Sequence, residues 1–144
     1  MQVAGEWVPC ADEVIRPIVM GELLTADREW VRVPFLLDTG ADRSMLSAAV
    51  LGLLGSVDTG PMVPVSGIGG TEEAAVVRTQ LGLTQIDGTK LIFRMDLIAS
   101  CEELSLDMSV LGRDITNLFA VIVDWPGHRI NLIGQRHHYS IDYH

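Results

Sequence analysis

Short apolar stretches separated by clusters of turn-forming residues run along most of the chain. Alternating or continuous apolar residues over a few positions are typical of β-strands. Predicted strands lie at residues 14–24, 30–37, 61–65, 73–83, 91–99, 108–111, 120–124 and 129–133. Pro17 predicts an edge position or an irregular start for the first strand, because proline cannot donate a ladder hydrogen bond. The pattern as a whole predicts an all-β fold, either a small barrel or a sandwich.

Helices contribute little to this pattern. Ser47 is a suitable N-cap for a short apolar helix over residues 48–54, and Gly55 would end it. One or two helical turns are predicted over residues 114–118. The remaining connections are turns, with Asp-Gly at 87–88 as a strong hairpin signal.

Composition predicts one globular domain. The chain has 144 residues, 48% hydrophobic and 20% charged, and this balance is typical of a folded protein. The formal net charge of −9 argues against nucleic acid and acidic membrane surfaces as partners, because no basic patch would neutralise phosphates.

Cysteine usage and the N-terminus favour a cytoplasmic protein. Cys10 and Cys101 are too few for a disulfide framework and lack metal-ligand spacing. No basic segment followed by an apolar run begins the chain, and no stretch of about 18 apolar residues could span a membrane. The neighbouring His137 and His138 would point to different sides of a strand, so we expect no metal and no other cofactor.

The most informative feature is an acidic residue at the end of an apolar strand. Asp38 follows Phe35-Leu36-Leu37 and is followed by Thr39-Gly40. A carboxylate that is carried toward a core costs free energy unless something satisfies or uses it. Asp38 is therefore either a turn residue that caps its own backbone or a catalytic carboxylate.

A second Asp-Thr-Gly tripeptide provides an internal comparison. Asp58-Thr59-Gly60 follows Gly55-Ser56-Val57 and precedes Pro61, a context that predicts a surface turn. The two tripeptides are too close in sequence to belong to two equivalent lobes. We therefore assign chemistry to Asp38 and not to Asp58.

Three motifs occur in a set order, and together they resemble the retropepsin-like aspartic proteases. The resemblance covers roughly residues 14–133. It rests on Leu36-Leu37-Asp38-Thr39-Gly40-Ala41-Asp42, then Gly67-Ile68-Gly69-Gly70, then Leu111-Gly112-Arg113-Asp114. The resemblance implies a small closed barrel with one or two short helices, acting as a homodimer. Residues 1–13 would be an N-terminal segment and residues 134–144 a C-terminal tail.

The resemblance also implies roles for the first motif. Asp38 would be the catalytic aspartate, and Thr39 would lock the two active loops together across the dimer axis. Gly40 would permit the tight turn. Ala41 and Asp42 would contact the substrate main chain.

The other two motifs would shape and support the site. Gly67, Ile68, Gly69 and Gly70 would form a flap over a bound peptide, although a plain hairpin turn is the alternative interpretation. Leu111 and Gly112 would support the active loop. Arg113 would pair with Asp42, whereas a solvated surface arginine is the alternative.

This chemistry needs two carboxylates, and a chain of 144 residues is too short for two lobes. The resemblance therefore implies a homodimer that hydrolyses a polypeptide substrate. A rival hypothesis is a module with this fold that dimerises or binds peptides without cutting them. A second rival is a latent protease whose residues 1–12 occupy the cleft.

Overall fold

The computed structural model describes residues 1–67, 69–102 and 107–134. Two helices are present in that part of the chain, α1 (Ala48–Leu54) and α2 (Arg113–Thr116). The strands are β1 (Gln2–Pro9), β2 (Ile15–Leu24), β3 (Trp30–Leu37), β4 (Met45–Leu46), β5 (Val63–Gly67), β6 (Gly70–Thr84), β7 (Lys90–Ser100), β8 (Ser109–Leu111), β9 (Ala120–Asp124) and β10 (Arg129–Ile133). The prediction of an all-β fold with short helices is confirmed.

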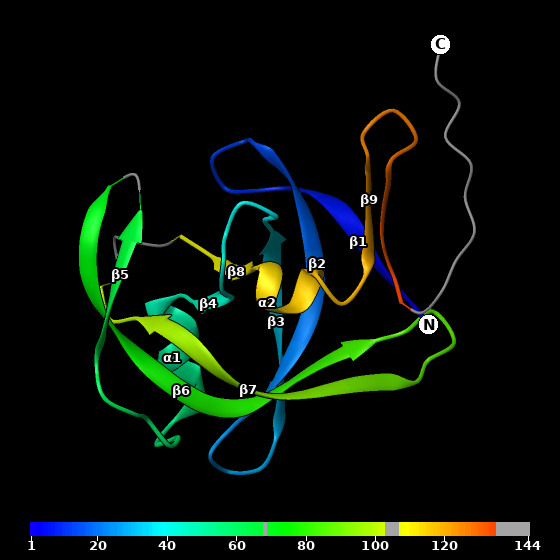
Figure 1. The fold of residues 1–144 in the computed structure, drawn as a ribbon. Coiled ribbons are helices and arrows are strands. Elements are labelled where there is room, and N and C mark those ends of the chain that lie inside the picture. The colour runs from blue at the N-terminus through cyan, green and yellow to red at the C-terminus, as the bar shows by residue number, and fades with distance from the viewer. Residues whose placement is uncertain (68, 103–106, 135–144) are drawn as a thin grey trace.

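Six strands close into a barrel (Figure 1). The strand order runs β6-β7-β4-β8-β3-β2, and an additional pairing of β6 with β2 joins the two ends. That closing pairing is antiparallel and runs from Gly21–Leu83 to Leu23–Leu81. Closure satisfies backbone donors and acceptors that an open sheet would leave at its edges.

The barrel encloses one apolar core. Fully buried side chains come from most of the strands that form the ring and from α1. They include Phe35, Leu23, Leu46, Leu54, Leu81, Leu83, Leu97 and Leu111. β3 alternates between this core and the outside, with Val33, Phe35 and Leu37 buried, as the period of a strand requires.

The sheet continues beyond the barrel through β1, β10 and β9. Residues 2–5 of β1 pair with β10, and residues 6–9 pair with β2. Pro17 lies in the part of β2 that pairs with β1 but extends past its pairing with β3, which agrees with the predicted edge position. In Figure 1 the β9–β10 hairpin and the β5–β6 hairpin lie at opposite sides of the molecule.

The N-terminal residues are part of the sheet. Residues 2–9 form β1, and residues 4–6 and 8–12 line a groove together with Leu36 and Val110. A latent form in which residues 1–12 occupy the cleft stays a prediction. Val3 is buried with 1% of its surface exposed, and β1 connects β2 to β10. This segment is therefore a structural strand of the sheet.

The described residues contain no helix that is long and apolar enough to cross a membrane.

Candidate active site

The Asp38 turn sits at the end of β3 and is held by backbone hydrogen bonds. The Asp38 N–H donates to the Leu111 carbonyl oxygen at 3.1 Å, which ties the turn to the end of β8. The Gly40 N–H donates to Asp38 Oδ1 at 2.8 Å. Asp38 is half-buried, whereas Thr39 and Gly40 are exposed. The carboxylate therefore caps its own turn through Oδ1, and Oδ2 has no hydrogen-bond partner among the described residues.

The Asp38 turn is part of the loop between β3 and β4, which passes across the end of β8. β8 lies between β3, to which it is parallel, and β4, to which it is antiparallel. The loop between β3 and β4 therefore joins two strands that are not neighbours. The Arg113 N–H donates to the Ala41 carbonyl oxygen at 2.8 Å and fastens this loop to the start of α2.

Gly112 is placed where the two segments come closest. A Cβ atom at this position would lie 2.5 Å from the carbonyl carbon of Arg43 and 2.9 Å from the Ser44 nitrogen. Only glycine permits this approach without a shift of the backbone. This contact gives a physical reason for the supporting position predicted for Gly112.

A buried hydrogen-bond network lies under the loop. The Ser44 N–H donates to both Asp114 carboxylate oxygens at 2.9 Å, and the Ser44 hydroxyl donates to Asp114 Oδ1 at 2.6 Å. The Gly112 N–H donates to Ser44 Oγ at 3.0 Å. Ser44 is completely buried. The third sequence motif contains Asp114, but no role was predicted for it. Ser44 was not among the predicted site residues.

The ion pair predicted between Asp42 and Arg113 is present. The Asp42 side chain is 79% exposed and that of Arg113 is 50% exposed, so solvent screens their attraction. The pair thus bridges the loop and α2 on the surface, above the buried network of Ser44 and Asp114.

The glycine cluster forms the tip of a hairpin, as predicted. Gly67 in β5 pairs with Gly70 in β6, and Gly70 has a φ of 117°, which favours glycine. Gly69 is exposed. A Cβ atom at any of these three glycines would meet nothing within 4 Å, so the tip is open to solvent. Ile68, the fourth predicted flap residue, lies outside the described residues.

A groove of about 900 Å³ reaches Leu36, two residues before Asp38. Leu36 and Val110 line it, and these two residues are register partners in β3 and β8. Asp38 follows the end of β3 by one residue and does not itself line the groove. The rest of the groove wall comes from the N-terminal segment, residues 4–6 and 8–12, and from Arg16, Ile18, Met20, Arg32, Pro34, Asp107 and Met108.

Two charged residues of the groove wall, Asp12 and Arg16, form an ion pair that remains charged at mildly acidic pH. Arg16 donates to both oxygens of the Asp12 carboxylate, at 2.7 and 2.6 Å. The hydrogen bond from Arg16 lowers the pKa of Asp12 from 3.8 to about 2. A carboxylate with a lowered pKa contributes stability above its unfolded pKa, and that contribution is lost as the pH falls through the folded value. This part of the groove wall therefore keeps its charges at mildly acidic pH.

The second tripeptide is exposed but does not form the predicted turn. Thr59 bridges to Val77 in an antiparallel manner, and the Gly60 N–H donates to the Val76 carbonyl oxygen at 2.7 Å. Asp58-Thr59-Gly60 therefore lies extended along β6, because hydrogen bonds to a neighbouring strand replace those of a local turn. Asp58 is exposed, in contrast to Asp38.

Within the described ranges, no group of three or more histidine, cysteine, aspartate or glutamate residues is arranged to hold a metal ion. The Asp38 turn presents a half-buried carboxylate with one oxygen engaged in its own turn.

Comparison with known proteins gives the fold a name. No family model matches the chain, and no curated protein matches it. Among solved structures, a retropepsin-like aspartic protease from Rickettsia conorii aligns over 92% of this chain and 88% of its own, with 16% identity and a TM-score of 0.55. The EIAV protease complexed with the inhibitor HBY-793 aligns over 76% of this chain and 92% of its own, with 26% identity and a TM-score of 0.48. The chain has a retropepsin-like fold, as its motifs predicted.

Proposed function

We propose that this chain is one half of an aspartic endopeptidase, which a second copy completes. The observation that carries the proposal is the Asp38 carboxyl, fixed through Oδ1 at the end of β3, two residues after Leu36 of the groove wall. The retropepsin-like fold supports it, since solved proteins with similar folds are described as proteases.

Two Asp38 carboxyls, one from each copy, would act as a dyad. Two carboxylates held close together cannot both ionise easily, so they share one proton. The ionised member acts as a general base on a water molecule, and the protonated member polarises the scissile carbonyl. The proton then passes to the leaving nitrogen. Activity is expected at acidic to mildly acidic pH, because the dyad must remain singly protonated.

The requirement for a second copy follows from the single catalytic turn. The Asp38 turn supplies one carboxyl, and Asp58 lies extended along β6 with a different surrounding. Thr39 and Gly40 are exposed, so their atoms are accessible to a partner across a two-fold axis. Symmetry would then place the two Asp38 carboxyls together.

The substrate would be an extended polypeptide. The groove that reaches Leu36 has both aliphatic and charged residues in its wall, and Ile18, Leu36 and Val110 suit apolar substrate side chains. The ion pair of Asp12 and Arg16 in the groove wall, together with Asp42, would face the peptide main chain. The exposed glycine tip between β5 and β6 would close over the peptide, because glycines let backbone amides approach closely.

Paired substitutions test the catalytic assignment. Asp38→Asn should reduce cleavage of a peptide library, assayed at several pH values, by about a thousandfold or more. Asp58→Asn is the matched control, because it makes the same change in the same tripeptide, and it should leave the rate unchanged. Cleavage that survives Asp38→Asn would show that another residue does the chemistry. A wild-type dimer that binds peptides but cleaves none would support the non-catalytic module instead.

A mixture of wild-type and Asp38→Asn chains tests separately whether two chains share one catalytic site. When equal amounts of wild-type and Asp38→Asn chains exchange freely, about a quarter of the dimers carry two aspartates. Total activity should then fall to about one quarter of that of an all-wild-type sample. A fall to about one half would mean that each chain acts alone, which contradicts the shared dyad.

A further inference from the structure

A second cavity lies at the other end of the barrel from Asp38. It has a volume of about 710 Å³ and is bounded by the turn between β2 and β3, the segment after α1, residues 78–80 of β6 and residues 94–96 of β7. The turn lies at the start of β3 and Asp38 at its end, and the eight residues between them span roughly 25 Å at about 3.3 Å per residue. This cavity is therefore remote from the proposed catalytic turn.

Positive charge gathers in this cavity although the chain is acidic. Three arginines and two aspartates line it, whereas the whole chain has a formal net charge of −9. Arg78 donates to Asp96 at 3.0 Å, and the charge of Asp58 also acts on Arg78. Both cavity carboxylates are thus associated with Arg78.

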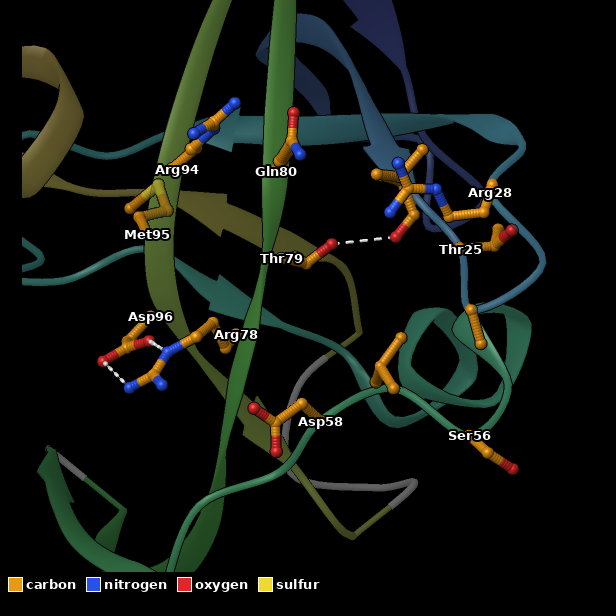
Figure 2. Close-up of a pocket in the computed structure, with 13 residues that line it drawn as sticks. Thr25, Arg28, Ser56, Asp58, Arg78, Thr79, Gln80, Arg94, Met95 and Asp96 are labelled. Atoms are coloured by element: carbon orange, nitrogen blue, oxygen red, sulfur yellow. Dashed lines mark hydrogen bonds and ion pairs between the residues drawn. The ribbon is translucent and has the colours of Figure 1, made fainter.

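The other two guanidinium groups have no ionic partner in the part of the chain that the structure describes. Among the described residues, neither Arg28 nor Arg94 forms an ion pair or a side-chain hydrogen bond. Gln80, the register partner of Arg94 across β6 and β7, likewise has no hydrogen bond from its amide in that part of the chain. In Figure 2, Arg94 and Gln80 stand on neighbouring strands, and the Arg28 side chain turns back from its loop toward β6.

We infer that this cavity binds a small oxyanion, a phosphate or a carboxylate group, through Arg28 and Arg94. A guanidinium presents several donors in a planar fork that matches an oxyanion, and such charge-assisted hydrogen bonds are stronger than neutral ones. The Gln80 amide supplies a further donor from the cavity wall. Leu24, Val57 and Met95 provide an apolar wall for the body of a molecule that carries the anion.

Titration of the full chain tests this site. The probes are inorganic phosphate and acetate, each compared with sodium chloride at equal ionic strength, with binding followed by calorimetry and by the NMR signals of the arginine side chains. The Asp38→Asn chain is a suitable background, because the cavity does not involve Asp38. Failure of the catalytic proposal would therefore leave this result unaffected.

Three arginine variants make the test specific. Arg28→Gln and Arg94→Gln should each weaken binding of the active probe by about tenfold or more, because each removes a charged donor. Arg129→Gln is the matched control: it removes the same charge from an exposed position on β10 that does not line the cavity, and it should change the affinity less than about twofold. Far-UV circular dichroism checks that all three variants fold.

The outcomes separate clearly. Saturable binding of phosphate alone, of acetate alone or of both supports the site and identifies which oxyanion it accepts. Absence of saturable binding of either probe at millimolar concentration overturns the proposal. Equal weakening by Arg129→Gln would also overturn it, because the binding would then reflect the overall charge and not the cavity.

Discussion

At the scale of single residues, the close approach of Gly112 to the active loop gives the sharpest expectation. Gly112→Ala should lower the free energy of unfolding by about 1–3 kcal/mol, because the new Cβ would meet the Arg43 backbone at 2.5 Å. Gly52→Ala provides the control. Gly52 lies within α1, and a Cβ there would meet nothing within 4 Å. Alanine should stabilise this helix by about 0.5–1 kcal/mol. Urea unfolding of the two variants measures whether each substitution lowers or raises the free energy of unfolding. A destabilising effect of the same size at both positions would contradict this account.

At this scale the sequence predicted one contact of the loop with α2 and missed another. Asp38, Asp42 and Arg113 were predicted from the order of the motifs, and the pair between Asp42 and Arg113 formed as expected. The contact of Ser44 with Asp114 joins residues 70 positions apart. No local pattern encodes such a contact, because it depends on β8 lying between β3 and β4.

At the scale of elements, two links fasten α2 to the loop, and they should differ in strength. Asp114→Ala leaves the buried Ser44 N–H and hydroxyl without an acceptor, which should lower the free energy of unfolding by about 1–3 kcal/mol. Asp42→Ala removes an exposed ion pair and should cost less than about 1 kcal/mol. Denaturant titration ranks the two variants. An equal or larger effect of Asp42→Ala would show that the surface pair, and not the buried network, holds the loop.

Elements that are bounded by strong turn residues were predictable from sequence. The strands at 120–124 and 129–133 match the structure at both ends, because the Trp125-Pro126-Gly127-His128 turn defines their register. Two strands were missed. β4 has only two residues, too few for an alternating pattern, and β1 is held by pairing with β10 at the far end of the chain. Long-range pairing of this kind leaves little trace in a local window.

At the scale of the whole molecule, the described chain is a closed barrel with a sheet extension that its own N-terminus completes. β1 pairs along one half with β2 and along the other half with β10, so it connects the barrel to the β9–β10 hairpin. Residues 1–12 could act as a removable inhibitory segment or as a structural part of the sheet, and the two roles predict different effects of their deletion. A segment that blocked the cleft could be removed without harm, whereas a strand between two others could not.

Removing residues 1–9 should therefore destabilise the chain and should not activate it. The deletion exposes the β2 and β10 edges and the apolar surface that Val3 covers, and burial of one such side chain contributes about 1.5–3 kcal/mol. Since a domain is stable by only about 5–15 kcal/mol, losing a whole strand should shift thermal unfolding to much lower temperature or abolish it. Val3→Ala is the graded companion variant and should cost about 1–3 kcal/mol. Circular dichroism melting curves and a peptide-cleavage assay compare the stability and the activity of the deleted chain with those of the full-length protein. A deleted chain that melts like the full-length protein and gains protease activity would mean that the N-terminal strand restrains the enzyme, contrary to its place in the sheet.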